Sequence, residues 1–322
     1  MKRFIWALLA LLFLSLPANA ATCYWVGGTG NFDNTNTASW ASGTGGTAST
    51  CAATGGIPKN AGDIATFDGA SGGGTVTVCG GSSAACPTSS GLLSLATITM
   101  GAFTGTLDFD AIDPNVTLTG TLNISGTGAR TLSAGSGTWT FTSNSGSIFE
   151  ATTLTNFSNP TTAFSSATLT FTATTASTRS VVTGAAMTFG TINVGANTSA
   201  GQFNLSVPNS TTLTISTFNV TAPNRLLLNG GTARTYAFTN GFSLTGSAGS
   251  TIEMTSSAAT FPTVSSANTM GGTYMSISGL AFAGGGNLTA TSSFDGGGVS
   301  ISGGGAKSIT APSGGGSYII GG

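Results

Sequence analysis

Histidine is absent from the 322-residue sequence, and charged residues are scarce. Asp, Glu, Lys and Arg make up 5% of the chain, against about 25% in ordinary globular proteins. The absence of histidine excludes Ser-His-Asp and Cys-His catalysis in their usual form. A net charge of −1 without any basic cluster argues against a nucleic-acid partner. The composition therefore argues against a catalytic function and does not favour any particular reaction.

Long apolar runs are missing after residue 20, since no later stretch approaches the roughly 18 apolar residues that a membrane-spanning helix needs. Before that point, Lys2 and Arg3 precede an apolar stretch, residues 4–16, and Pro-Ala-Asn-Ala supplies a small-x-small cleavage site. This pattern predicts a secretory signal peptide, residues 1–20, cleaved after Ala20. We therefore expect the mature protein to be secreted or held at the cell surface, with no integral membrane segment.

Cysteine is rare, and all four cysteines lie in the first quarter of the mature chain: Cys23, Cys51, Cys79 and Cys86. An even number of cysteines in an exported protein favours disulfide bonds. Of the three possible pairings we favour Cys23–Cys51 with Cys79–Cys86, because the second pair closes a short Gly/Ser loop. A zinc site is the alternative, but the CxxC spacing typical of zinc ligands is absent. We expect the disulfides to staple a loop-rich opening module, residues 21–90.

Glycine is abundant, at 50 residues, and threonine and serine are frequent as well. Such a composition is compatible with disorder. However, 39% of the residues are hydrophobic, the mean hydropathy is +0.29, and 19 phenylalanines are placed regularly. Because this apolar surface can offset the entropy lost on ordering, we predict a folded chain.

Apolar and polar residues alternate through residues 92–320. In the segment GTWTFTS, Trp139 and Phe141 fall on one side of an extended chain, and the three threonines fall on the other. Similar short stretches recur, separated by Gly, Ser, Asn or Pro, and no stretch has the 3.6-residue period of a helix. The pattern predicts an all-β fold.

Three all-β architectures compete: an antiparallel sandwich, a propeller and a parallel solenoid. The Asn-Gly pairs at 229–230 and 240–241 could each close an antiparallel hairpin. Most breaks between strands are instead loose Ser/Thr/Gly segments, which suit stacked coils with ladders of polar residues. We therefore predict a degenerate right-handed parallel β-helix (β-solenoid) over residues 91–322, with about 20 to 25 residues per turn.

The opening module contains a pattern of spaced residues, W-x-G-G-x-G-N-[aromatic], a second Trp, and P-x-x-x-G-D-x-x-x-F-D-G. The matching residues are Trp25, Gly27, Gly28, Gly30, Asn31, Trp40, Pro58, Gly62, Asp63, Phe67, Asp68 and Gly69. The module resembles the leading segment of bacterial surface and autotransporter-type β-helix passengers, and of Thr/Gly-rich repeat proteins on phage particles. Residues 129–158 and 273–298 resemble a recurring unit and a closing unit of the same proteins. The resemblance implies an elongated surface or fibre component.

The sequence has one acidic cluster, Asp108, Asp110 and Asp113. We expect Asp108 and Asp110 to share one strand face about 7 Å apart, as the carboxylates of a polysaccharide hydrolase or lyase would. The three carboxylates are also a candidate calcium site, although calcium takes about six to eight oxygen ligands. A plain turn at Asp113-Pro114 is the simpler interpretation. We expect no catalytic residue, no metal and no cofactor.

Tyr24 and Trp25 are a candidate aromatic surface for stacking on sugars. The competing interpretation places Trp25 and Trp40 as a plug at the end of an elongated core.

Isolated charges elsewhere have simple interpretations. Asp63 and Asp68 flank a short strand, and we expect them to cap its turns. Arg179, Arg225 and Arg234 are isolated in the sequence, and we expect them to be solvated or to cap coils.

Together these features predict an exported, non-catalytic surface or extracellular protein that displays flat polar faces for adhesion or assembly. The expected partners are polysaccharide, cell-surface components or further copies of the chain, with residues 317–322 available for strand addition. The alternatives are a carbohydrate-active enzyme that uses Asp108 and Asp110, and a subunit of a fibre or phage-like appendage.

Overall fold

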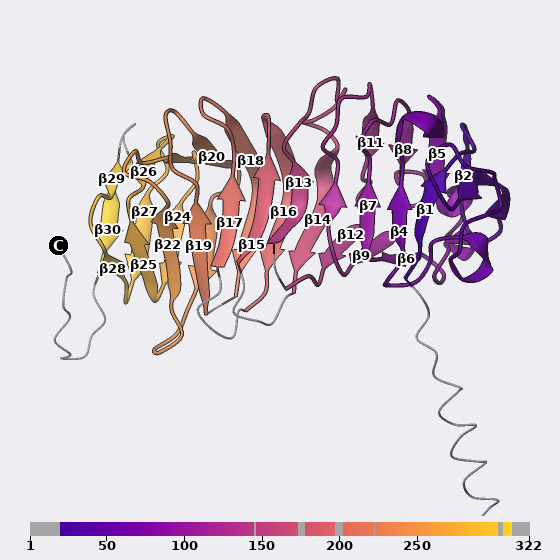
Figure 1. The fold of residues 1–322 in the computed structure, drawn as a ribbon. Helices are drawn as coiled ribbons and strands as arrows, with labels where there is room; N and C mark the ends of the chain where they lie inside the picture. The colour runs from indigo at the N-terminus through magenta and orange to yellow at the C-terminus, as the bar shows by residue number, and fades with distance from the viewer. Residues whose placement is uncertain are drawn as a thin grey trace, which may run out of the picture.

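The computed structural model describes residues 20–144, 146–172, 178–196, 202–221, 223–301 and 305–310. Its regular structure consists of strands β1 to β30 and five single-turn 3-10 helices (Figure 1), which confirms the predicted all-β fold. Residues 1–19 of the predicted signal peptide and the 317–322 tail lie outside the described residues.

Most strands belong to two large sheets. The first sheet has the spatial order β28 (Phe294–Asp295), β25 (Met275–Ser278), β22 (Ile252–Ser256), β19 (Asn224–Leu228), β17 (Gln202–Ser206), β15 (Arg179–Thr183), β13 (Gly146–Ala151), β10 (Leu122–Asn123), β7 (Thr97–Thr99), β4 (Ile64–Thr66), β1 (Thr22–Trp25) and β3 (Trp40–Ala41). The second sheet has the order β29 (Ser300–Ile301), β26 (Ala281–Ala283), β23 (Thr263–Ser265), β20 (Thr235–Phe238), β18 (Thr212–Val220), β16 (Met187–Val194), β14 (Phe164–Phe171), β12 (Thr138–Phe141), β9 (Asn115–Leu118) and β6 (Leu92–Leu95).

Smaller groups complete the fold. A branch of the second sheet contains β21 (Phe242–Thr245), β24 (Met270–Thr273), β27 (Leu288–Thr291) and β30 (Lys307–Ile309). A third sheet contains β11 (Thr131–Ser133), β8 (Thr106–Asp108), β5 (Thr75–Val78) and β2 (Gly30–Phe32). The 3-10 helices are η1 (Thr37–Ser39), η2 (Thr54–Gly56), η3 (Gly69–Ser71), η4 (Cys79–Gly81) and η5 (Ser83–Ala85).

Strands pair in parallel with strands two or three elements further along the chain, as in β4–β7, β7–β10 and β10–β13. Among the strands of the described ranges, only β1 and β3 pair antiparallel. Figure 1 shows the consequence, since the colour of the chain advances steadily along the long axis of the molecule. The chain therefore visits the sheets in turn and moves along the axis by one strand spacing per circuit.

The length of a circuit follows from side chains that hydrogen-bond between neighbouring strands or turns. Ser278 reaches Thr255 across 23 residues, and Asn156 reaches the Thr127 carbonyl across 29.

Neither Asn-Gly pair closes a hairpin, because β19 and β20 lie in different sheets, and β20 and β21 pair with other strands. The parallel pairing therefore argues against the antiparallel sandwich.

The core consists of the inward residues of successive strands. On β12, Trp139 and Phe141 are buried and the threonines beside them are half-buried, as the alternation predicts. The Trp139 ring lies 5.7 Å from the ring of Phe164, and Phe141 stacks on Phe171 at 4.9 Å between ring centroids. Apolar side chains thus stack from one circuit to the next along the axis.

Two disulfides constrain the opening module. Cys23 is bonded to Cys51 across 28 residues, and Cys79 to Cys86 across seven residues. This is the pairing favoured from the sequence, and the Cys79–Cys86 bond closes the Gly/Ser loop.

Aromatic side chains fill the N-terminal end of the core. Trp25, Trp40, Phe32 and Phe67 are all buried. The centroids of the Trp25 and Trp40 rings are 5.2 Å apart with the rings nearly perpendicular, and the Phe32 ring lies 4.8 Å from Trp40. This confirms the interpretation of Trp25 and Trp40 as an end plug.

Asp63 and Asp68 both cap turns, as expected. The Asp63 carboxylate accepts hydrogen bonds from the backbone N–H groups of Lys59 and Asn60 at 3.1 and 2.9 Å. Asp68 begins η3, where its carboxylate accepts from Ala70 N at 2.8 Å.

Candidate binding surface

The outward side of the second sheet carries a column of small polar residues. Successive strands from β6 to β18 contribute Ser94, Thr117, Thr140, Thr170, Asn193 and Asn219 at matching register. Hydrogen bonds run along this column, since Asn193 Nδ2 donates to Thr170 Oγ1 at 3.3 Å and Asn219 Nδ2 donates to Asn193 Oδ1 at 2.9 Å. The two amides are therefore held in fixed orientations.

A second column lies two residues earlier on four of these strands. It contains Thr138, Thr168, Thr191 and Thr217. Neighbouring strands are about 4.8 Å apart and two residues span about 6.6 Å along a strand, so the columns form a flat lattice. We call these ten residues the polar face, and all of them are uncharged.

The second sheet divides at β18. The first half of β18 pairs with β20, from Thr212–Thr235 to Ile215–Phe238, whereas Phe218 further along pairs with Phe242 of β21. From this point β20 and β21 begin two separate ladders, because a turn closed by the hydrogen bond from Gly241 N to the Phe238 carbonyl separates them and shifts the register against β18 by one residue. The polar face continues onto the β21 branch through Ser243, Gly271 and Thr289.

A hollow of about 520 Å³ lies at the start of this branch. Its lining residues are Thr217, Phe218, Asn219, Asn240, Gly241, Phe242, Ser243, Thr269, Gly271, Gly272, Thr273, Thr289 and Thr291. The volume falls within the range of about 300 to 1,000 Å³ that is usual for small-molecule sites. None of the lining residues carries a charge.

Two glycines of β24 shape the hollow. Gly271 and Gly272 have φ of +159°, where residues with side chains are strained. A Cβ on Gly271 would lie 1.6 Å from the Thr289 carbonyl oxygen, and one on Gly272 would lie 1.8 Å from that of Leu244. Only glycine therefore fits, and the column of side chains is interrupted at β24.

The chemistry of the hollow is that of neutral donors and acceptors. Asn240 Nδ2 donates to Thr217 Oγ1 at 3.3 Å, while Ser243, Thr289 and Thr291 are exposed. A hydroxyl both donates and accepts, so these groups match the hydroxyls of a sugar. No lining residue is a carboxylate, an amine or an imidazole, so the hollow itself supplies no side-chain acid or base.

The predicted carboxylate pair does not share a strand face. Strand β8 ends at Asp108, and Asp110 lies in the following turn, where its backbone N–H donates to Asp108 Oδ1 at 2.9 Å. The neighbours of Asp108 across the third sheet are Thr77 and Ser133. The expectation of two carboxylates on one strand face was therefore wrong, because the chain turns directly after Asp108.

Asp113 has a separate role. It has a positive φ of 51°, and its carboxylate accepts a hydrogen bond from the backbone N–H of Ser136 on the next circuit. Asp110 lines a smaller hollow of about 220 Å³ whose other lining residues are uncharged. Within the described ranges, no group of three or more His, Cys, Asp or Glu residues is placed to hold a metal ion.

The proposed aromatic surface of Tyr24 and Trp25 is not formed. Trp25 is fully buried and its Nε1 donates to the Gly28 carbonyl at 2.9 Å, whereas Tyr24 is half-buried on the outward side of β1. Successive residues of a strand point to opposite sides, so the two rings cannot present one surface.

Arg130 is a buried residue that sequence reasoning did not single out. Its guanidinium donates to the carbonyl oxygens of Ile124 at 2.6 and 3.0 Å, of Gly128 and Thr153 at 2.9 Å, and of Thr155 at 3.3 Å. It also lies 5.4 Å from the centroid of the Phe157 ring. Arg130 thus fastens two neighbouring circuits, while burial lowers its pKa.

Arg179 was expected to be solvated or to cap a coil, and the structure buries it fully. None of its three guanidinium nitrogens has a hydrogen-bond partner within the described residues, and burial lowers its pKa. Its guanidinium lies 5.9 Å from the centroid of the Phe203 ring, so the two groups make a cation–π interaction. Arg225 fits the solvated interpretation, since it is 48% exposed and pairs with Glu253 at 3.2 Å.

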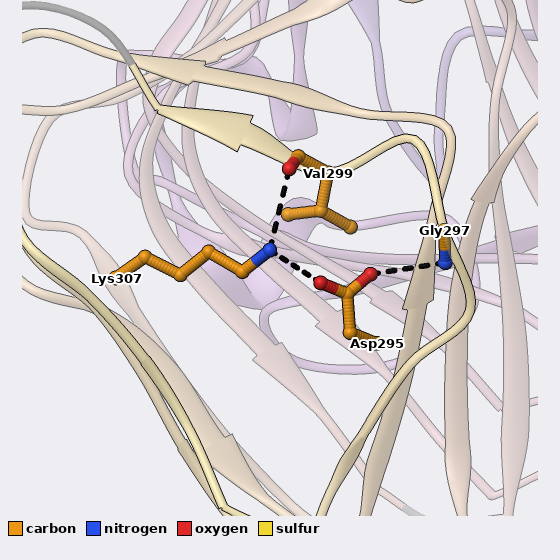
Figure 2. Close-up of polar contacts among 4 residues, drawn as sticks. All are labelled: Asp295, Gly297, Val299 and Lys307. Carbon is orange, nitrogen blue, oxygen red and sulfur yellow. Dashed lines mark hydrogen bonds and ion pairs between the residues drawn. The ribbon is translucent and has the colours of Figure 1, made fainter.

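At the C-terminal end, an ion pair joins two sheets (Figure 2). Lys307 of β30 pairs with Asp295 of β28 and donates to the Val299 carbonyl at 3.3 Å. The other carboxylate oxygen of Asp295 accepts from Gly297 N at 2.9 Å. Asp295 therefore both caps the Gly-rich turn and ties the branch to the first sheet.

No protein-family model, curated protein or solved structure matches this chain. In the part of the chain that the structure describes, no helix is long and apolar enough to cross a membrane.

Proposed function

We propose that the chain is an exported, non-catalytic contact protein, built as a right-handed parallel β-helix of the kind found in bacterial surface and phage-associated proteins. The parallel pairing of strands two or three elements apart supports the β-helix. The right hand follows from the strong preference of parallel crossover connections for that hand.

Export through the leader, with cleavage after Ala20, is part of this proposal. The two disulfides favour an oxidising, extracellular compartment.

The polar face is the observation that carries the contact function. Its residues are held in register over successive strands, and seven of the ten are β-branched threonines with few side-chain rotamers. A surface that is already ordered loses little entropy on binding. Because the face is uncharged, its partner is a neutral polymer rich in hydroxyl groups, and the hollow receives a sugar unit of such a polymer.

Binding to cellulose and chitin particles tests the face. We expect Thr140→Glu to lower the bound fraction by at least about tenfold, because the carboxylate would be desolvated without a partner. The matched control is Thr66→Glu, an outward position of β4 on the first sheet. Equal binding by both variants and the parent chain would refute contact through the polar face.

A second pair of variants separates the hollow from the flat lattice. Ser243→Tyr places a ring in the hollow, whereas Ser94→Tyr places one at the other end of the same column. We expect soluble neutral oligosaccharides to lose affinity for the first variant only, as measured by calorimetry. Unchanged affinity in Ser243→Tyr would remove the hollow from the binding surface.

A further inference from the structure

Asp63 is a fully buried carboxylate near the start of the described chain. Its Oδ2 accepts hydrogen bonds from the backbone N–H groups of Lys59 and Asn60 and from Asn60 Nδ2, at 2.9 to 3.1 Å. Its Oδ1 accepts from the backbone nitrogen of Ala21 at 3.0 Å. All of these donors are electrically neutral as the chain stands.

Asp63 lacks a cationic partner within the described ranges, where the ion pairs join Arg225 to Glu253 and Lys307 to Asp295. Burial of a carboxylate without a counter-charge is costly, even when its oxygens accept hydrogen bonds. Asp63 is therefore a buried carboxylate with neutral hydrogen-bond donors and without a cation beside it, which is an arrangement that a nearby positive charge would stabilise.

Ala21 lies at the boundary between surface and core. Ala20 is exposed, and Ala21 is 7% exposed. The Ala21 carbonyl accepts from Ile64 N at 2.8 Å, and β1 then pairs with β4 from Thr22–Ile64 onward. The N–H of Ala21 thus bonds to Asp63 and its carbonyl bonds to the next residue, Ile64, so the backbone of Ala21 is fixed beside Asp63.

We propose that Asp63 is the binding site for the α-ammonium group of Ala21 in the processed protein. The proposal rests on the proposed cleavage after Ala20. Hydrolysis of the Ala20–Ala21 bond consumes one water molecule, leaves a carboxylate on Ala20 and leaves an amine on Ala21 that takes up a proton at neutral pH. The hydrogen bond from Ala21 N to Asp63 Oδ1, which already has a charged acceptor, then gains a charged donor and becomes an ion pair.

Removal of Ala20 also lets water accept hydrogen bonds from the ammonium protons of Ala21 that do not face Asp63. Ala20 is exposed and lies beside Gly62, where a Cβ on that glycine would be 3.3 Å from the Ala20 Cβ. Its departure opens a path by which water reaches the new amino group. Cleavage after Ala20 thus gives Asp63 its cationic partner, and the mature chain is more stable than a chain that keeps even one leader residue.

A double-mutant cycle tests this inference. The four chains begin at Ala20 or at Ala21, end at Gly322, and carry either Asp63 or Asp63→Asn; urea unfolding is measured for each. We expect removal of Ala20 to raise the folding equilibrium constant by about tenfold or more with Asp63, and by less than about twofold with Asp63→Asn. Equal effects in both backgrounds would overturn the proposal.

The reactivity of the α-amine provides a test without a substitution. In the chain that begins at Ala21, we expect acylation of this amine at neutral pH to be at least about tenfold slower in the native state than in urea, because a paired ammonium is a poor nucleophile. Equal rates in the two states would refute the ion pair even if Asp63→Asn fails to fold. N-terminal sequencing of the exported protein separately tests cleavage after Ala20, so the failure of one proposal is distinguishable from the failure of the other.

Discussion

At the N-terminal end of the molecule, two disulfides and a cluster of buried aromatic rings close the core, whereas near the C-terminal end the second sheet divides and leaves a hollow. The N-terminal end contains Trp25 and Trp40, which contact each other edge to face. The C-terminal region depends instead on Gly271 and Gly272, which allow β24 to approach its neighbours. Large buried side chains and disulfide bonds stabilise the N-terminal end. In the C-terminal region, glycines replace side chains and leave a hollow.

The two ends of the molecule therefore differ in how the core is closed. An open stack of parallel strands has unpaired edges, which invite association with other chains. The antiparallel strand β3 and the aromatic plug cover that edge at the N-terminal end. The interrupted column at β24 places the hollow of the proposed binding surface far from the aromatic plug.

The largest expected effect is at the plug. Trp40→Ala should lower the free energy of unfolding by about 3 to 5 kcal/mol, because it empties a fully buried site. The matched truncation at the other end, Phe261→Ala, removes a ring that is 44% exposed and should change stability by less than about 0.5 kcal/mol. Urea denaturation of both variants measures the contrast, and equal losses would show that the ends are not built differently.

The disulfides should differ in a way set by the length of chain that each closes. Cys23→Ser with Cys51→Ser opens a 28-residue loop, and Cys79→Ser with Cys86→Ser opens a seven-residue loop. From the entropy of the unfolded chain we expect losses of about 3 to 4 and about 2 to 3 kcal/mol, respectively. Denaturation of the two double variants decides the order, and the reverse order would contradict this explanation.

The two buried arginines provide the next comparison. Arg130→Met removes the donors of several backbone carbonyls and should cost about 2 to 3 kcal/mol. Arg179→Met removes a buried cation that makes no hydrogen bond to the described residues, so it should be neutral or stabilising by about 1 kcal/mol. Thermal unfolding of both variants checks the prediction, and a larger loss for Arg179→Met would mean that its charge is compensated.

The smallest effect concerns alkaline pH. Tyr236 is buried and donates to the Leu205 carbonyl at 2.7 Å, and burial raises its pKa above the usual value of 10.0. Below pH 10 both folded and unfolded chains keep this proton; above it the unfolded phenol ionises first, so stability falls as pH rises. Tyr236→Phe should cost about 1 kcal/mol at pH 7 and remove this part of the alkaline loss. An unchanged slope of stability against pH above 10 would contradict the assignment to Tyr236.

The sequence predicted those features that depend on local order. Alternation on either side of Trp139 placed its ring in the core, and the spacing of Cys79 and Cys86 favoured their bond. It did not predict the burial of Arg130, whose acceptors include carbonyls at residues 153 and 155 on the next circuit. The division of the sheet at β18 was missed for the same reason, since the register between strands more than 20 residues apart decides it.

The polar face exists only if neighbouring strands hold the register described for β16 and β18, and cysteine pairing measures that register directly. In Asn193→Cys with Asn219→Cys, the two Cα atoms are paired neighbours about 4.8 Å apart, within the range that a disulfide spans. In Thr191→Cys with Asn219→Cys they are about 8 Å apart, beyond that range. After mild oxidation of the folded proteins, peptide mapping by mass spectrometry should find the new disulfide in the first variant and free thiols in the second. A bond in the second variant and none in the first would contradict the register and the surface built on it.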